Sequence, residues 1–241
     1  MIQTEVVPLG EVFEGDLIPE GLTNGRLHIP PIQREYQWGP ATESDKPDAN
    51  RSAAQFLEDS LNFFEMSEGD DVPDPYFMGT MIVYREEEDE EGVYRLMDGQ
   101  QRWTTTMAMM AVVWHFLDRD SSGNDWGPIM RDIEDHFLLT SESPPKPKLR
   151  SHRDYDDYTI QRLCKFDGTM GIDDLDPSGN FPEAPVMVYD GGEYTGTNLF
   201  CVLSAFMDRI EQYFGLTSGA DSRERLVRFY TCARDQLFVN L

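Results

Sequence analysis

Cysteine is scarce in this chain of 241 residues, and the way it is distributed excludes two kinds of architecture. The three cysteines lie far apart, and none belongs to a CxxC motif or is paired with a histidine. That spacing excludes a disulfide framework and a structural zinc site. We therefore expect small buried apolar side chains at Cys164, Cys201 and Cys232.

Long apolar runs are also missing. No stretch approaches the roughly 20 apolar residues of a membrane-spanning helix, and the first residues do not place an apolar segment after a basic one. We expect a cytoplasmic protein. The Walker pattern GxxxxGK followed by Ser or Thr is absent too, so any nucleotide hydrolysis would not use a P-loop.

Lysine is rare, and the formal net charge is −25. A protein that contacts DNA usually has a basic surface, so the net charge alone argues against nucleic acid. The acidic residues are spread along the whole chain, however, as in proteins of halophilic organisms, whose acidic surfaces keep them soluble. On that interpretation the net charge reports the habitat, and local arginines must be considered separately.

The most informative stretch is a polar corner between a predicted strand and a predicted helix. Residues 93–97 suit a short strand, and residues 107–117 are a long apolar run of helix formers. Gly99 between them allows an unusual backbone conformation, and the N–H groups of the next turn favour an anion such as phosphate. The helix dipole disfavours a cation in that first turn, so the position of Arg102 there indicates that it pairs with an anion of a ligand. Alternatively, Asp98 caps the helix and Arg102 pairs with an acid.

A second motif is an arm at residues 27–38. Two consecutive prolines favour an extended conformation and forbid ladder donors, so we expect a loop or the edge of a sheet. The arm presents side chains suited to stacking on a base while holding a phosphate. Alternatively, its aromatic residues pack on the core. The candidate residues are Gln33, Arg34, Tyr36 and Trp38.

Residues 76–84 predict a buried strand in which Gly79 indicates a close backbone approach. The acidic residues 86–91 that follow predict a solvated hairpin tip rather than a metal site, because like charges repel one another. The strands on either side of this tip would then be antiparallel neighbours and would place Asp98 at one end of a sheet. We also predict helices at residues 52–66, 126–139, 197–214 and 222–233, and strands at residues 186–189 and 236–241.

The most basic stretch lies at residues 144–153. Its side chains could contact a DNA backbone, or they could balance the charge of Asp154, Asp156 and Asp157. The basic residues are Lys146, Lys148, Arg150, His152 and Arg153. The cluster of Asp173, Asp174 and Asp176 lacks the spacing of an EF-hand, so we expect a solvated loop there.

The sequence resembles a known family at three motifs in matching order and separation: the arm Ile29-Pro30-Pro31-Ile32-Gln33-Arg34-Glu35-Tyr36-Gln37-Trp38, the strand Tyr76-Phe77-Met78-Gly79, and the corner Asp98-Gly99-Gln100-Gln101-Arg102. These motifs are similar to the N-terminal domain of GmrSD-type modification-dependent restriction proteins. That family is related to ParB and sulfiredoxin folds and includes the phosphorothioate-sensing SspE proteins. The resemblance covers about residues 5–118 well and the rest loosely.

The resemblance implies an α+β fold, with a small mixed ParB/sulfiredoxin-like sheet and helices in residues 1–118 and a mainly helical subdomain in residues 119–241. It also implies a site for a nucleoside triphosphate with Mg²⁺. Asp98 would hold the Mg²⁺ or orient the attacking water, and Arg102 would neutralise charge on the phosphoryl group. Backbone and amide donors to the phosphates would come from Gly99, Gln100 and Gln101. Arg34 would be a second clamp.

The function implied by the resemblance is a nucleotide-hydrolysing sensor of modified DNA in restriction and phage defence. Gln33, Tyr36 and Trp38 would sense the DNA, and a nuclease domain or subunit outside this chain would cut it. From the apolar run that ends the chain we expect either a fragment of a longer protein or an early-ending variant. The alternative function is a non-catalytic ParB-like module that binds DNA or a protein partner. A sulfiredoxin-like enzyme is disfavoured because no cysteine or histidine lies near the corner.

Overall fold

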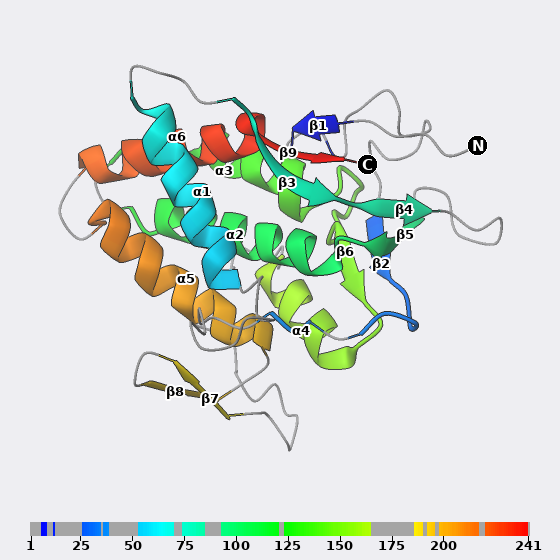
Figure 1. Ribbon diagram of the computed structural model, residues 1–241. Helices are drawn as coiled ribbons and strands as arrows, with labels where there is room; N and C mark the ends of the chain where they lie inside the picture. The colour runs from blue at the N-terminus through cyan, green and yellow to red at the C-terminus, as the bar shows by residue number, and fades with distance from the viewer. Residues whose placement is uncertain are drawn as a thin grey trace.

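Helix α2, Gln100–Asp118, runs through the middle of the protein in the computed structural model (Figure 1). Residues 107–117 are apolar on almost every side, and a helix without a polar face is stable only inside a core. Accordingly, residues 103–117 are all buried. The structure describes residues 6–8, 12, 26–34, 36–38, 53–69, 74–84, 93–120, 123–164, 186–189, 192–195, 198–216 and 220–240.

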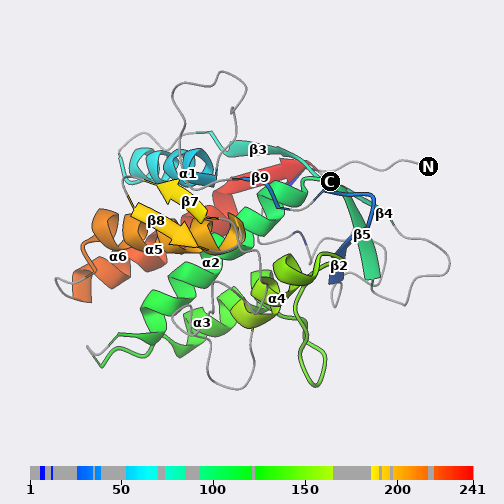
Figure 2. The same cartoon turned by 90° about the horizontal axis from the view of Figure 1, so that it is seen from below.

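Other helices surround α2, as two perpendicular views show (Figures 1 and 2). These are α1 (Ala53–Ser67), α3 (Gly127–Ile133) with the π-helical turn η3 (Glu134–Leu138), α5 (Asn198–Phe214) and α6 (Ala220–Gln236). Helix α4 (Asp154–Leu163) contacts α5. The four helices predicted from the sequence are therefore confirmed, with bounds that differ by a few residues.

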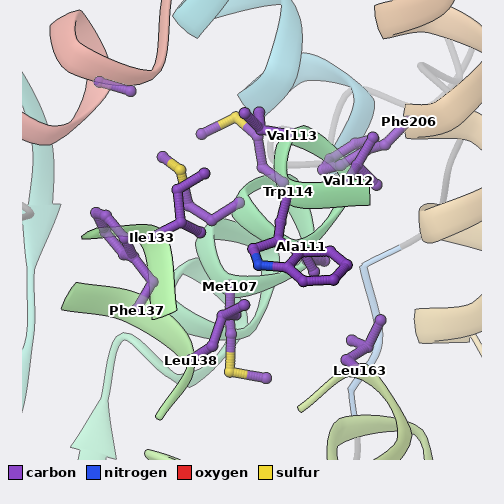
Figure 3. Close-up of a cluster of buried hydrophobic side chains, with 14 of the residues drawn as sticks. Met107, Ala111, Val112, Val113, Trp114, Ile133, Phe137, Leu138, Leu163 and Phe206 are labelled. Atoms are coloured by element: carbon purple, nitrogen blue, oxygen red, sulfur yellow. The ribbon is translucent and has the colours of Figure 1, made fainter. Parts of the chain in front are cut away.

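One hydrophobic core joins these elements. In Figure 3, Met107 and Trp114 of α2 lie in a cluster with Ile133 and Phe137 from the segment after it and with Phe206 of α5. Further along, Phe64 of α1 packs on Phe214 and Phe229, with ring centroids 6.0 and 5.6 Å away. The boundary proposed at residue 118 stays a prediction. The three cysteines are buried, as expected.

A mixed four-stranded sheet lies at the N-terminal end of α2 (Figure 1). Its order is β4-β5-β2-β6, in which β2 is parallel to β5 and β6 and β4 is antiparallel to β5. The strands are β2 (Arg26–Ile29), β4 (Ile82–Tyr84), β5 (Val93–Asp98) and β6 (Leu149–Ser151). With the surrounding helices, this sheet gives an α+β fold.

A second sheet has the order β1-β9-β3, and its middle strand comes from the end of the described chain. Strand β9 is antiparallel to β1 and parallel to β3. The remaining two strands form an antiparallel hairpin. The bounds are β1 (Val6–Pro8), β3 (Tyr76–Thr80), β9 (Leu237–Asn240), β7 (Val186–Tyr189) and β8 (Gly192–Thr195).

Two predictions about strands need correction. Residues 76–84 form two strands instead of one, because the chain leaves β9 after Thr80 and pairs with β5 from Ile82, with Met81 buried between them. The predicted antiparallel pairing with the strand before Asp98 is confirmed for β4 alone. The start of the arm is also no sheet edge: β2 is paired on both sides, because the two prolines come after the strand has ended.

Some predictions fall outside the described residues. These are the acidic hairpin tip at residues 86–91 and the cluster of Asp173, Asp174 and Asp176. Among the helices that the structure describes, none is long and apolar enough to span a membrane.

Candidate functional site

The corner and the arm, about 60 residues apart in the sequence, together form a pocket of about 170 Å³. It lies where β5 ends and α2 begins. Of the candidate residues of the corner and the arm, all except Tyr36 line it. The lining residues are Gln33, Arg34, Trp38, Asp98, Gly99, Gln100, Gln101 and Arg102.

Gly99 makes the corner possible. It has φ 86° and ψ 3°, in the left-handed region that favours glycine. A Cβ atom there would lie 2.6 Å from the Cγ of Met81, so a side chain would also collide with the strand junction. The first bond within α2 runs from the N–H of Trp103 to the carbonyl of Gly99, 2.9 Å. The N–H groups before Trp103 have no acceptor within the helix, and this end of a helix dipole attracts anions.

Asp98 and Arg102 lie on either side of this turn. Asp98 Oδ1 accepts a 2.8 Å bond from the N–H of Gly99, and its Oδ2 lies 3.6 Å from Nη2 of Arg102. The Asp98 side chain is 58% exposed, whereas that of Arg102 is 12% exposed. Gly99 is the N-cap residue, and no side chain caps the helix. The alternative in which Asp98 caps α2 is therefore wrong in its first part, while Arg102 does pair with an acid, Asp98 itself.

The two glutamines of the corner fasten the arm. Nε2 of the buried Gln100 donates to the carbonyl of Arg34 at 2.6 Å. Oε1 of Gln101 accepts from the backbone N–H groups of Gln37 and Trp38 at 2.8 and 3.1 Å. Gln100 Nε2 is therefore bonded to protein instead of directed at a ligand. In this conformation the side chains of Gln100 and Gln101 position the arm.

Tyr36 is the anchor of the arm and is only 3% exposed. Its hydroxyl lies 2.6 Å from Oγ1 of Thr105, which itself donates to the carbonyl of Gln101, so Tyr36 must be the donor. The backbone of Tyr36 donates to Asp156 Oδ2 at 2.9 Å and accepts from Asn198 Nδ2 at 3.0 Å. Burial raises the pKa of the Tyr36 phenol.

Burial changes the interpretation of Tyr36 as a DNA-sensing residue. Its ring packs in the core, which is the alternative given above for the aromatic residues of the arm, and it is not available to stack on a base. Gln33 and Trp38 do lie at the pocket. Gln33 Nε2 donates to the carbonyl of Met97 at 2.8 Å, and the half-buried Trp38 packs on Phe56 with ring centroids 6.1 Å apart.

The pocket is rich in positive charge compared with the rest of the chain. Arg34 is exposed, and its guanidinium makes no hydrogen bond or ion pair with the residues that the structure describes. Among the described residues that line the pocket, Arg34 and Arg102 are the cations and Asp98 is the one carboxylate. In a protein with a formal net charge of −25, this local excess of cations favours an anionic ligand.

A resident metal site has no support in the described part of the chain, where no three His, Cys, Asp or Glu side chains gather. Mg²⁺ that arrives with a nucleotide needs less, because it commonly takes one or two carboxylates together with phosphate oxygens and waters. The exposed carboxylate of Asp98 at the pocket fits that role.

The basic stretch at residues 144–153 is mostly used inside the protein. Lys148 is 3% exposed, and its Nζ donates to the carbonyl of Asp135. Arg150 makes two 2.7 Å bonds to Asp157. Lys146 pairs with Glu142 at 2.6 Å, and His152 Nδ1 lies 3.2 Å from the carbonyl of Ile29. The bonds from Arg150 to Asp157 match the charge-balance alternative, and Lys146 and Arg153 are the exposed members of this set.

Sequence reasoning missed two residues that hold the arm from a distance. Asp156 of α4 and Asn198 of α5 both bond the backbone of Tyr36. They lie more than 100 residues from the arm, and no local pattern marks either one. The sequence indicates Gly79 as a site of close approach, but it does not identify the neighbour, which is Arg102.

Residues 16–181, more than half of the chain, match the sequence profile of the GmrSD restriction endonuclease N-terminal domain. This segment contains the arm, the strand with Gly79 and the corner. No curated protein matches the chain.

Proposed function

Because the chain belongs to the family of GmrSD restriction endonuclease N-terminal domains, it is a module of a restriction or defence protein, and we propose that this module binds and hydrolyses a nucleoside triphosphate. The observation that carries the proposal is the pocket between corner and arm. There a glycine-based helix N-terminus, two arginines and one exposed carboxylate converge. These are groups that bind phosphates and stabilise charge during phosphoryl transfer.

The size of the pocket indicates which part of the nucleotide it holds. Sites that enclose a whole small molecule usually measure about 300–1,000 Å³, so a pocket of about 170 Å³ suits the phosphates. The sugar and base would extend along the arm, where Trp38 lines the pocket. An aromatic side chain there offers a stacking surface for a base.

In the proposed reaction, water attacks the γ-phosphorus, the bond from that phosphorus to the bridging oxygen breaks, and nucleoside diphosphate and phosphate leave. Arg102 offsets the negative charge that develops on the phosphoryl oxygens. Arg34 holds the phosphates from the opposite side, and Asp98 bonds the attacking water or contacts Mg²⁺. Mg²⁺ would neutralise charge on the β- and γ-oxygens when bound.

In this proposal, DNA binding is the signal that changes the rate of hydrolysis. We propose that modified DNA approaches the arm, where Gln33 and Trp38 lie at the pocket, and that Tyr36 acts indirectly by holding the arm in place. Cutting would be done by a nuclease domain or subunit that works with this module.

One observation favours the alternative of a non-catalytic DNA- or partner-binding module. Both carboxylate oxygens of Asp98 already face protein donors, since Oδ1 accepts from Gly99 and Oδ2 lies near Arg102. A carboxylate used in this way would hold the corner together without activating water.

A measurement of phosphate release distinguishes the nucleotide-hydrolysing module from the non-catalytic binding module. The assay uses the full-length protein with each common nucleoside triphosphate and Mg²⁺, with plain or modified DNA, at salt concentrations up to molar, because salt screens the carboxylates. We expect release that changes when modified DNA is added. No release with any nucleotide at any salt would remove the hydrolysis proposal and favour the binding module.

A further inference from the structure

Strand β3 approaches the pocket through Gly79, which lies against Arg102. Gly79 has φ +118°, and a Cβ atom there would lie 1.9 Å from Nη1 and 3.1 Å from Cζ of Arg102. Contacts under 3.0 Å essentially do not occur for real Cβ atoms, so no side chain fits while the guanidinium occupies this place. The missing side chain of Gly79 leaves the space that the guanidinium fills.

The backbone of β3 is also irregular at this point. Its register against β9 shifts between Phe77 and Gly79, which is the pattern of a β-bulge. Bulges redirect backbone and side-chain groups and often lie next to functional sites. Here the carbonyl of Met78, inside the shift, lies 3.5 Å from Nη1 of Arg102.

The neighbouring strand explains why Arg102 can reach β3. Strand β5 pairs with β4 as far as Asp98, opposite Ile82, and then turns into α2 at Gly99. Because β5 ends there, it does not extend alongside β3, the strand that precedes β4 in the chain. Arg102, in the first turn of α2, extends to the backbone of β3.

We propose that Gly79 and the bulge at Met78 form a seat that positions the guanidinium of Arg102 at the pocket. Gly79 is thus a positioning residue that acts through Arg102. The consequence for binding rests on the proposed function, because the seat matters to a ligand only if the pocket binds phosphates. A seated guanidinium presents its donors in a fixed direction, and a flat bidentate group needs such a direction to bond phosphate oxygens.

The test compares Gly79→Ala with a matched glycine substitution. Gly123→Ala is the control, because Gly123 also has positive φ, +87°, but a Cβ atom there meets nothing within 4 Å. Both substitutions are made in the natural protein and in an Arg102→Lys background. Lysine lacks the Nη atoms that would collide with the new methyl group, so it should relieve the conflict.

The first readout is affinity for non-hydrolysable adenine and guanine nucleoside triphosphate analogues with Mg²⁺, titrated separately by calorimetry. With Arg102 present, Gly79→Ala should weaken binding about tenfold or more, the loss expected for a charge-assisted contact. In the Arg102→Lys background it should change affinity less than about twofold, as Gly123→Ala should in either background. Undiminished binding by Gly79→Ala would overturn the seat and leave the proposed function standing.

The second readout is the thermal unfolding midpoint, which needs no ligand. Gly79→Ala should lower Tm more in the natural protein than in the Arg102→Lys background, whereas Gly123→Ala should lower it equally in both. If the natural protein binds neither analogue, the proposed function fails, and this comparison still decides the seat. Equal losses of Tm for Gly79→Ala in both backgrounds would overturn it.

Discussion

The pocket at the corner and the basic stretch at residues 144–153 both place cations close together in a very acidic chain, but they use them differently. In the basic stretch, Lys146 and Arg150 bond carboxylates and Lys148 bonds a buried carbonyl. At the pocket, Arg34 is exposed, and Arg102 lies 3.6 Å from its carboxylate. The density of basic residues in the sequence therefore does not show which of them can meet a ligand.

Backbone geometry accounts for the difference. Where acidic residues are abundant, a cation on an ordinary helix or strand finds an acidic neighbour, as Arg150 finds Asp157. At the corner, the glycines Gly99 and Gly79 remove side chains from the positions where the pocket and Arg102 need space. Glycine at these two positions therefore leaves space in the corner that a side chain would fill.

The largest effect expected is the loss of hydrolysis when the charged residues of the corner are removed. Asp98→Ala and Arg102→Ala should each lower the rate about a hundredfold or more, since one lost electrostatic contact to a phosphoryl transition state costs about 3 kcal/mol. Both proteins should stay folded, as judged by circular dichroism. Arg153→Ala, in the basic stretch, is the matched control and should be as active as the natural protein. If hydrolysis survives both changes at the corner, the corner is structural.

A smaller effect, a loss of nucleotide affinity, is expected when the hydrogen bonds that hold the arm are removed and the charged residues are left unchanged. Gln101→Ala removes the acceptor of two arm N–H groups, so nucleotide affinity should fall about tenfold, as for two hydrogen bonds of about 0.5–1.5 kcal/mol each. Gln55→Ala is the control, because Gln55 bonds Asp59 on the exposed side of α1. Equal nucleotide affinity in the two variants would mean that binding does not depend on the hydrogen bonds between Gln101 and the arm.

The contrast between the two regions also shows what the sequence could predict. The corner was identified because its parts are adjacent in the chain: a strand, Gly99, and the first turn of a helix. The buried helices were predictable from their apolar periodicity. The break at Met81 was not, because residues 76–84 are apolar throughout and only the partner strands distinguish β3 from β4.

The attachment of the arm likewise depends on contacts far apart in the sequence. The burial of Tyr36 results from Thr105, Asp156 and Asn198, which belong to three different helices. An aromatic residue in an arm can face solvent or core, and its spacing does not decide which. The family resemblance identified the corner and the arm as neighbours, but not the bonds between them.

The salt dependence of DNA affinity should distinguish the pocket from the basic stretch. We propose that Arg34, on the DNA-sensing arm, also bonds a DNA phosphate. Arg34→Ala should then reduce the slope of log affinity against log salt by about 1, as expected for one lost phosphate contact. Lys146→Ala should leave the slope unchanged, because Lys146 is paired with Glu142. Filter binding across a range of salt concentrations measures both slopes. A reduced slope for Lys146→Ala with no change for Arg34→Ala would assign DNA to the basic stretch.

The smallest effect concerns acid stability. The hydrogen bond from Lys146 lowers the pKa of Glu142 below its ordinary 4.5. A carboxyl group whose pKa is lowered in the folded protein stabilises the fold at pH values above its ordinary pKa. This stabilisation is lost as the pH falls through the pKa of the folded state. Lys146→Ala should therefore cost less than about 1 kcal/mol at pH 7, as for surface pairs. The cost should vanish well below pH 4.5, as chemical denaturation at both pH values can show. A difference that persists in acid would mean that Lys146 stabilises the fold by packing.

The measurement that tests the central claim most directly is a crystal structure of the protein with a non-hydrolysable nucleoside triphosphate analogue and Mg²⁺. The account predicts phosphate density against the backbone of residues 99–101, with Arg102 and Arg34 in contact with the phosphate oxygens. An analogue bound in another pocket, with the corner left empty, would contradict it.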